Sequence, residues 1–287
     1  IPLRLVGSEM CIRDSDKTAA VGADGVVAVL TGDGLANMCT PWTGGAAHIP
    51  ALRSPEQHAM AVDIVRWQGE PVVAVVATSR ALAEDAVEML AIDWEPLPAV
   101  SDAGAALVAD AHHVHPGDAD NLAFEARAGN ETATEAGDST VSAKFTFGRH
   151  TGVPLETRAT VADWNPGDES LTVYASHQTP WQQQDVISRH LGIDEHKVRV
   201  ICPDVGGGFG IKLHVYGDEI ATAALSRVLA RPVKFVADRL ESFVSDMHSR
   251  DHVVTASIKD NGHRATGMTV DAVGGIGPYS AYKRASI

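Results

Sequence analysis

The chain has 287 residues, and its 23 Lys and Arg against 37 Asp and Glu give a formal net charge of −14 at pH 7. This length allows two domains and a sizeable core. The acidic balance argues against a nucleic-acid surface, because phosphate contacts need clustered Lys and Arg. Apolar runs such as Val72–Ala77 are too short to span a membrane.

The three cysteines, Cys11, Cys39 and Cys202, are odd in number, lie far apart and form no CxxC motif. Neither a disulfide framework nor a zinc site is therefore indicated. We expect a cytoplasmic protein.

The two ends of the chain differ from the rest. Residues Ile1–Ser15 do not continue into the periodic pattern that follows, and they resemble translated adapter sequence from assembled environmental reads. We therefore predict that residues 1–15 are not native and exclude them from the fold. The chain stops at Ala285–Ile287 after a glycine-rich turn and without a terminating signal. Together the ends predict a fragment of a longer reading frame.

Residues 16–102 are predicted to form a compact α/β domain, because strands and a helix alternate along them. Ser79 is a suitable N-cap for the helix. In chain order we predict a strand at Val26–Leu30, a turn at Gly32–Gly34, a loop at Met38–Glu56, strands at Val62–Trp67 and Val72–Ala77, a helix after Ser79 and a strand at Ala91–Trp94.

Residues 103–139 are rich in Ala, Gly, Asp and Asn and have weak periodicity, which predicts a linker. The linker carries His112, His113 and His115. A metal site would need further ligands from elsewhere in the chain, so we interpret these histidines as part of a solvated loop and assign no direct metal ligand.

Residues 140–287 are predicted to form a second domain. The strand at Val141–Phe147 places Val141, Ala143, Phe145 and Phe147 on one face. The other predicted elements are strands at Arg158–Trp164 and Ser170–Ala175 around a turn at 165–168, a helix from Pro180, a strand at Val198–Cys202, a helix at Asp218–Leu229, and strands at Val233–Ala237, Val253–Ile258 and Thr266–Val273.

The strongest chemical signal is Gly206-Gly207-Gly208-Phe209-Gly210-Ile211-Lys212 between a predicted strand and a predicted helix. Glycines allow close approach of a ligand, and successive N–H groups can point at an anion or an oxo group. The P-loop pattern fails because Ile211 separates Gly210 from Lys212, and the dinucleotide pattern GxGxxG fails as well. A tight turn that binds nothing remains an alternative.

Two side chains near this loop are candidates for a binding site. Phe209 is costly on an exposed loop, and we expect it to form a wall of a pocket. Gln178 follows the strand at Ser170–Ala175, where a neutral amide could donate to an oxo or sulfur ligand.

Several motifs together resemble the large, molybdopterin-binding subunit of the molybdenum hydroxylases, the family of xanthine dehydrogenase, aldehyde oxidase and aerobic carbon monoxide dehydrogenase. The resemblance runs from about residue 16 to residue 287. It rests on Gly69–Val72 through Trp94–Val100, on Pro154–Arg158, on Ser176–Pro180, on Asp204–Lys212, and on the spacing from Gln178 to Phe209.

The resemblance implies a mixed α/β fold, with an N-terminal α/β hammerhead-type domain followed by the first part of the molybdopterin-binding domain. It implies that Gln178, Gly207, Gly208, Phe209 and Gly210 bind a molybdenum–molybdopterin cofactor, expected in the cytosine dinucleotide form. The family hydroxylates a substrate carbon with water as the oxygen source. Its catalytic base is a glutamate expected beyond Ile287, so no catalytic residue is assigned here, and we interpret Glu156 as a structural carboxylate.

The resemblance also bears on substrate and partners. Purine-hydroxylating members carry Glu directly after the loop lysine, whereas this chain has Leu213. We therefore expect Phe209 and Leu213 to line the substrate pocket, and an aldehyde, N-heterocycle or carbon monoxide-like substrate rather than xanthine. The resemblance implies an FAD-binding medium subunit and a [2Fe–2S] small subunit as partners, in a dimer of heterotrimers.

Two other functions stay open. A non-catalytic α/β binding module could use the glycine loop for a phosphate-bearing ligand. A decayed, inactive copy of the enzyme subunit is the third interpretation.

Overall fold

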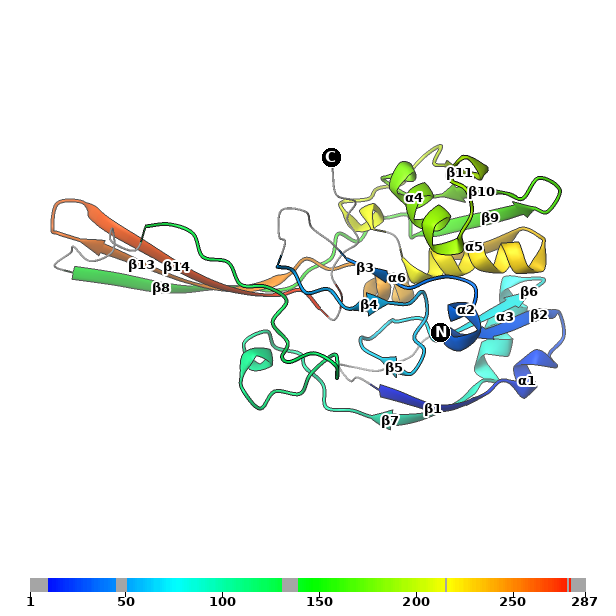
Figure 1. Ribbon diagram of the computed structural model, residues 1–287, viewed down its shortest axis with the longest axis horizontal. Coiled ribbons are helices and arrows are strands. Elements are labelled where there is room, and N and C mark those ends of the chain that lie inside the picture. The colour runs from blue at the N-terminus through cyan, green and yellow to red at the C-terminus, as the bar shows by residue number, and fades with distance from the viewer. Residues whose placement is uncertain (1–9, 45–50, 131–138, 215, 278, 280–287) are drawn as a thin grey trace.

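The computed structural model describes residues 10–44, 51–130, 139–214, 216–277 and residue 279. Strands and helices alternate along the chain (Figure 1), which confirms the predicted mixed α/β class. The elements of the N-terminal half are β1 (Met10–Asp16), α1 (Thr18–Val21), β2 (Val26–Thr31), α2 (Gly32–Ala36), β3 (Trp42–Thr43), β4 (Glu56–Gln57), β5 (Ile64–Val65), β6 (Val73–Ala77), α3 (Arg80–Glu88), β7 (Ala91–Pro96) and the 3₁₀ turn η1 (Ala105–Leu107). Those of the C-terminal half are β8 (Ser139–Phe147), β9 (Ala159–Asn165), β10 (Ser170–Ala175), α4 (Pro180–Leu191), η3 (Glu195–Lys197), β11 (Val198–Ile201), η4 (Ile211–Leu213), α5 (Gly217–Leu229), β12 (Val233–Val236), α6 (Arg239–Ser245), β13 (Asp251–Asp260) and β14 (Ala265–Gly275).

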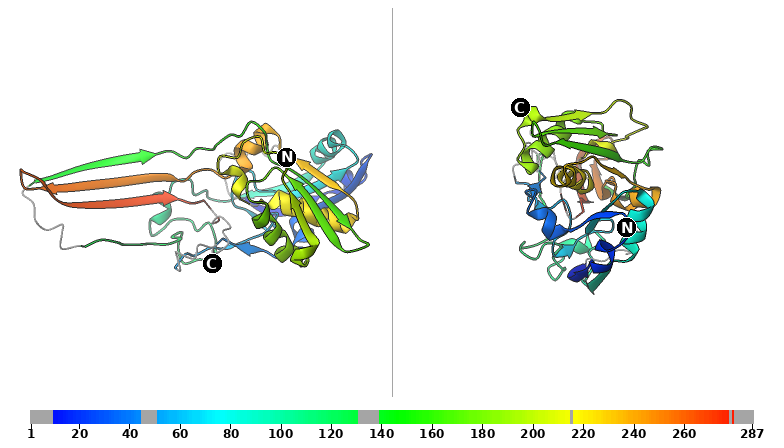
Figure 2. Two further views of the ribbon diagram at one scale, coloured as in Figure 1. Left: turned by 90° about the horizontal axis from the view of Figure 1, so that it is seen from above. Right: turned by 90° about the vertical axis from the view of Figure 1, so that its right-hand side faces the viewer.

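A four-stranded sheet in the order β11-β10-β9-β12 is the centre of the C-terminal half. β9 and β10 form the predicted hairpin, with Ser170 opposite Asn165, and β11 pairs with β10 in parallel. α4 packs on β11, while α5 packs on β9 and β12. α5 lies between this sheet and the N-terminal half (Figure 2). All of its residues from 219 to 226 are buried, as expected for a helix covered on every side.

The N-terminal half contains an antiparallel pair, β2-β6, and a three-stranded sheet in the order β5-β1-β7. Ser79 caps α3 as predicted, because its side-chain oxygen accepts a hydrogen bond from the Leu82 N–H at 3.3 Å. The predicted turn at Gly32–Gly34 is wrong, since these residues begin the short helix α2. A Cβ at Gly32 would lie 1.9 Å from the Ala61 carbonyl oxygen, so this glycine serves close packing.

Residues 10–15, which the sequence pattern separated from the fold, form most of β1. Met10 is buried, and Ile12 packs against the core formed by β2 and β6. β1 also supplies the hydrogen-bonding partner of β7, with Cys11 opposite Glu95 and Ile12 opposite Trp94. Residues 1–9 lie outside the described residues, so the non-native origin of residues 1–15 stays a prediction.

The described residues form two hydrophobic cores. One of them combines side chains from before and after the predicted linker. The first contains Val29, Val73 and Ala86 from the N-terminal half. The second combines Trp42 and Met60 with residues of the C-terminal half that include Leu171, Ile187 and Ile220. The N-terminal half therefore contributes to a core of the second half, while the predicted domain boundaries at 102 and 140 stay predictions.

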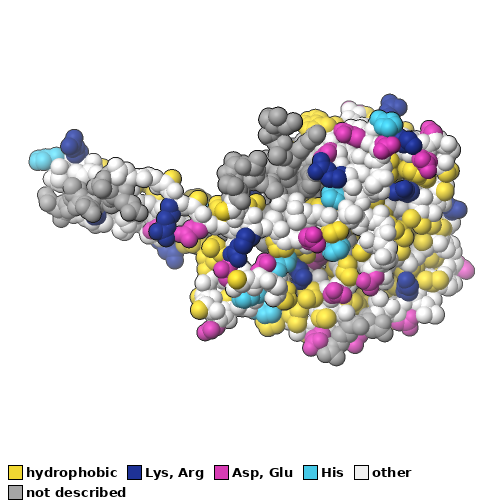
Figure 3. Space-filling model, viewed as in Figure 1, with side chains coloured by type: hydrophobic (Ala, Val, Ile, Leu, Met, Phe, Trp, Pro, Cys, Tyr) yellow, Lys and Arg dark blue, Asp and Glu magenta, His cyan; other side chains and the backbone are white. Residues whose placement is uncertain are grey.

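A further sheet, in the order β14-β13-β8, projects from the rest of the molecule as a long arm (Figures 1 and 3). The pairing places Ile258 opposite both Val141 and Met268. Because side chains alternate along each strand, one face of the arm is apolar. Its members are Val141, Ala143, Phe145, Phe147, Val254, Ala256, Ile258, Met268, Val270 and Ala272. Phe145 is 50% exposed and Phe147 59% exposed, so the described residues leave this face largely uncovered.

Candidate functional site

The glycine loop, residues 206–212, runs from β11 into the 3₁₀ turn η4, and α5 begins only at Gly217. The helix predicted at Asp218–Leu229 is confirmed as α5 (Gly217–Leu229), and the loop does not lead directly into it. The physical reason is that Gly210 adopts a left-handed conformation with φ of +85°, and His214 is extended. The N–H groups of the loop are consequently not a helix N-terminus and must bind a ligand through the loop geometry itself.

Gln178 lies against the glycine loop, although it precedes Gly210 by 32 residues. Its side-chain oxygen accepts a hydrogen bond from the Gly210 N–H at 3.1 Å, and its own backbone N–H donates to the Lys212 carbonyl oxygen at 2.8 Å. A Cβ at Gly208 would lie 2.4 Å from the Gln178 side-chain oxygen. The structure thus brings together the amide and the loop that the sequence pattern singled out, and it shows why Gly208 has no side chain.

Several hydrogen-bond donors at this place remain free. Among the described residues, no acceptor faces the N–H groups of Gly207, Gly208 and Phe209, nor the side-chain Nε2 of Gln178. Because the Gly210 N–H must face an acceptor, it directs the Gln178 oxygen inward and leaves the amide NH₂ as the free donor. Successive free N–H groups of this kind form a concave binding site for an anion or an oxo group.

Phe209 and Leu213 stand at the exposed side of the loop. The Phe209 side chain is 74% exposed and that of Leu213 38% exposed, so the described residues do not enclose Phe209 in a pocket. Phe209 also has a positive φ of 51°. A bulky residue in the left-handed region stores strain of order 1–3 kcal/mol, and such strain concentrates at functional sites.

The segment 176–179 is tied to the residues that follow the loop. The His177 ring accepts at Nδ1 from the Thr179 N–H at 3.0 Å, so its Nε2–H donates to the His214 carbonyl oxygen at 2.9 Å. Burial lowers the pKa of His177 to about 4, and the ring is neutral at pH 7. The Thr179 hydroxyl donates to the Leu213 carbonyl oxygen at 3.2 Å. These contacts fix the backbone that carries Gln178.

An ion pair between the buried Lys212 and the partly exposed Glu156 lies at the base of the loop. The Lys212 ammonium donates to Glu156 Oε2 at 2.6 Å and to the Ser176 hydroxyl oxygen at 2.7 Å. The same carboxylate oxygen accepts from the Gly206 N–H at 2.6 Å. Desolvation works to raise the pKa of Glu156, but the hydrogen bonds from Lys212, Ser176 and Gly206 outweigh it and hold this pKa below its usual value.

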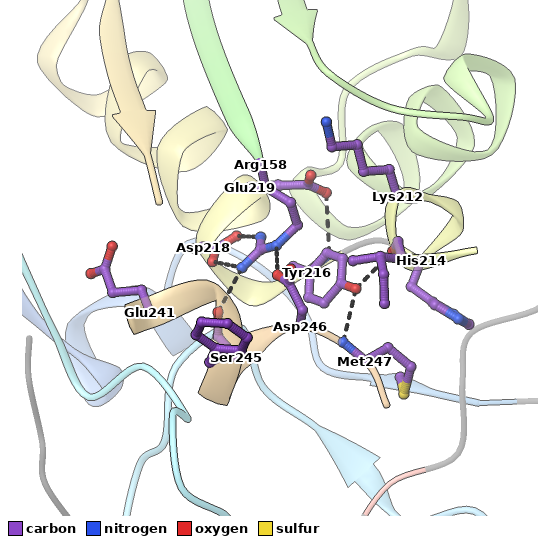
Figure 4. Close-up of polar contacts among 12 residues, drawn as sticks. Arg158, Lys212, His214, Tyr216, Asp218, Glu219, Glu241, Ser245, Asp246 and Met247 are labelled. Carbon is purple, nitrogen blue, oxygen red and sulfur yellow. Dashed lines mark hydrogen bonds and ion pairs between the residues drawn. The ribbon is translucent and has the colours of Figure 1, made fainter. Parts of the chain in front are cut away.

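Arg158 forms a second buried charge cluster, between α5 and α6 (Figure 4). Its guanidinium binds both oxygens of Asp218 at 2.6 and 2.7 Å and one oxygen of Asp246 at 2.7 Å. The same group lies over the Tyr216 ring, 3.8 Å from its centroid. The Tyr216 hydroxyl donates to the Ile211 carbonyl oxygen at 2.7 Å, which links the cluster to the glycine loop.

Other candidate sites remain without support. No group of three or more His, Cys, Asp or Glu side chains could hold a metal ion within the described residues. In the predicted linker, Asn121 donates to the His112 carbonyl oxygen at 2.8 Å. Of the helices that the structure describes, none is long and apolar enough to cross a membrane.

Sequence reasoning assigned no role to Lys212, Ser176, His177 or Arg158, although all four are buried at the site. Charged residues are rarely fully buried unless they are paired, and the partners Asp218, Asp246 and Glu156 are distant in sequence. The one available signal was their placement in or next to the motifs that carry the family resemblance.

The chain is similar to known proteins over most of its length. Residues 114–287 match the family model of the molybdopterin cofactor-binding domain, and residues 8–98 match that of the aldehyde oxidase and xanthine dehydrogenase a/b hammerhead domain. The large subunit of nicotine 6-hydroxylase from Paenarthrobacter nicotinovorans is 37% identical over 77% of this chain and 27% of its own length. The carbon monoxide dehydrogenase large chain of Hydrogenophaga pseudoflava is 32% identical over 94% of this chain and 35% of its own.

Solved structures show the same fold. Quinoline 2-oxidoreductase from Pseudomonas putida 86 superposes with a TM-score of 0.86 and 29% identity, covering 92% of this chain and 34% of that one. Carbon monoxide dehydrogenase from Oligotropha carboxidovorans gives a TM-score of 0.81 and 27% identity, covering 96% and 40%. The chain spans about a third of the length of the curated relatives it matches.

Proposed function

Since the chain belongs to the aldehyde oxidase and xanthine dehydrogenase family of molybdopterin-binding proteins, we propose that it is part of the catalytic subunit of a molybdenum-dependent hydroxylase. The main support is a group of free hydrogen-bond donors at one place: the N–H groups of Gly207, Gly208 and Phe209 and the side-chain amide of Gln178. These donors suit a cofactor that presents oxo, sulfur and phosphate acceptors.

Each residue at this site is proposed to have its own role. Gln178 donates its NH₂ to an acceptor of the cofactor, and the N–H groups of Gly207, Gly208 and Phe209 hold the cofactor from the loop side. Gly210 contributes by holding the Gln178 side-chain oxygen with its own N–H. Phe209 and Leu213 face the substrate. When bound, the molybdenum–molybdopterin group supplies the redox centre at which a substrate carbon is hydroxylated with oxygen from water. Glu156, the carboxylate that contacts the loop, is held by Lys212, and we assign no catalytic base among the described residues.

An aldehyde, an N-heterocycle or a carbon monoxide-like molecule fits this site better than xanthine. Leu213 offers no hydrogen bond to a purine. The relatives support the same choice, since those named for nicotine and carbon monoxide are 37% and 32% identical, and a xanthine dehydrogenase molybdenum-binding subunit of Escherichia coli O157:H7 is 28% identical.

The electrons of the reaction need a route out of the subunit. The three cysteines of the chain lie far apart in sequence, whereas iron–sulfur clusters need sets of cysteine ligands. We therefore propose an FAD-binding medium subunit and a [2Fe–2S] small subunit as partners, in a cytoplasmic dimer of heterotrimers. The cofactor is proposed in its cytosine dinucleotide form.

Metal analysis tests this function. The full-length subunit, expressed with molybdate and its partner subunits, is expected to hold about one molybdenum and one pterin per chain. Protein that holds neither, while inorganic phosphate protects the glycine loop from hydrogen exchange, would favour the phosphate-binding module instead.

Gln178→Ala is expected to slow turnover about 10²- to 10³-fold, as for loss of one donor that stabilises developing charge. Molybdenum content should stay at the wild-type level because the loop N–H groups remain. The measurements are kcat and metal content, with Gln68→Ala as the matched control outside the loop. Unchanged kinetics would remove Gln178 from the site.

A further inference from the structure

The glycine loop is closed at its base by a single carboxylate oxygen. Glu156 Oε2 accepts from the Gly206 N–H, the first residue of the loop, at 2.6 Å and from the Lys212 ammonium, the last residue, at 2.6 Å. It also accepts from the Ser176 hydroxyl at 2.5 Å. The two ends of the loop therefore meet at one atom.

Backbone hydrogen bonds also hold the two ends of the loop, Gly206 to Glu156 and Lys212 to Gln178. The Glu156 N–H donates to the Gly206 carbonyl oxygen at 3.3 Å, and the Gln178 N–H donates to the Lys212 carbonyl oxygen at 2.8 Å. Between these ties lie the three N–H groups without a described acceptor. Their direction depends on how the ends of the loop are held, because the glycines between them impose little of their own.

The pair is asymmetric in its exposure to water. The Lys212 side chain is 0% exposed and that of Glu156 is 41% exposed. Lys212 depends on Glu156 and Ser176 for its hydrogen bonds, whereas water can reach the Glu156 carboxylate. A charge buried at the inner side of a binding loop is an expensive way to stabilise a fold, since apolar replacements of such pairs are often neutral. This points to a role in geometry.

We propose that Glu156 and Lys212 are a positioning pair, which closes residues 206–212 into a ring and thereby aims the N–H groups of Gly207, Gly208 and Phe209 at the cofactor. Neither side chain touches the cofactor in this role. The inference rests on the proposed function for the identity of the ligand, but the closure of the loop is a property of this chain alone.

Three variants of the full-length subunit separate positioning from simple stabilisation. Glu156→Gln keeps an acceptor for Gly206 but leaves the Lys212 charge buried without a counter-charge. Lys212→Met removes the charge and frees the end of the loop. The double variant Glu156→Gln/Lys212→Met contains neither charge and is expected to recover the melting temperature that Glu156→Gln loses. The matched control is Glu169→Gln/Lys197→Met, which removes an exposed pair of the same residue types at 3.3 Å.

The decisive readout is hydrogen exchange of the loop amides, followed by mass spectrometry of peptides that cover residues 206–212. In Lys212→Met and in the double variant, the loop amide hydrogens should exchange at least tenfold faster than in wild type, while exchange in β10 stays unchanged. The molybdenum content of both variants should be at least tenfold lower than that of wild type. The control should match wild type throughout. A double variant that regains wild-type stability, loop exchange and molybdenum content would overturn the proposal. If wild-type protein binds no molybdenum, the proposed function fails, while the exchange comparison still decides the role of the pair.

Discussion

Arg158→Met is expected to lower the free energy of unfolding by about 3–5 kcal/mol, the cost of removing one partner from a buried ion pair. Arg158 is 1% exposed and Asp246 6% exposed, so water cannot replace the lost guanidinium. Burial opposes the charge of Arg158, but Asp218 holds the pKa of Arg158 above its usual value. Without this cation, the carboxylates of Asp218 and Asp246 face each other unpaired.

Urea unfolding followed by circular dichroism measures this loss. Arg127→Met is the control, because Arg127 pairs with Glu125 at 3.0 Å on the surface, with side chains 83% and 60% exposed. Exposed pairs contribute about 1 kcal/mol or less. Adding Asp218→Asn and Asp246→Asn to Arg158→Met should recover part of the stability. A loss no larger than that of the control would contradict the buried-charge account.

Glu70→Gln is expected to stabilise the protein by about 3 kcal/mol at pH 8 and by little at pH 4.5, where wild type carries the protonated acid. Burial raises the pKa of Glu70 from 4.5 to about 7, against the opposing hydrogen bond and charge of Arg66. The folded state therefore holds the proton more tightly than the unfolded state. The free energy of unfolding of wild type is therefore undiminished by Glu70 below pH 4.5. It falls by about 1.4 kcal/mol per pH unit as the pH rises from there towards 7.

The glutamine variant keeps the structural contact but not the titration. The Arg66 N–H donates to Glu70 Oε2 at 2.7 Å, and an amide oxygen can accept the same bond. Unfolding curves of the variant and wild type at pH 4.5 and pH 8 give the comparison, with Glu84→Gln at an exposed pair on α3 as the control. Parallel pH dependence of Glu70→Gln and wild type would refute a titrating buried acid.

Local patterns predicted several of the elements that have a short-range signal. The β9–β10 hairpin follows from the turn Asn165-Pro166-Gly167-Asp168. The side chains of Asn165 and Asp168 each accept a hydrogen bond from the backbone N–H two residues later. α6 could have been predicted as well, since Asp238 and Glu241 form a capping box. By contrast, Gly32 reads as a turn locally but begins α2, where it packs closely against Ala61.

The candidate site also contains residues that the sequence could identify and residue pairings that it could not. Gln178 and the glycine loop could be identified from sequence because each carries an unusual residue type in an unusual context. The pairings of Lys212 with Glu156 and of Arg158 with Asp218 and Asp246 could not, since the partners lie 56, 60 and 88 residues apart. The tertiary fold brings each carboxylate to its cation, since Asp218 lies on α5 and Asp246 follows α6.

The apolar face of the arm bears on how such a protein is made. A sheet with one apolar face and one polar face needs a second layer to cover the apolar face. The edge strands β8 and β14 also have backbone groups that can pair with a neighbouring chain. While Phe145 and its neighbours are uncovered, this apolar face favours association with other chains. The order in which the arm is made and covered then becomes a requirement of successful biogenesis.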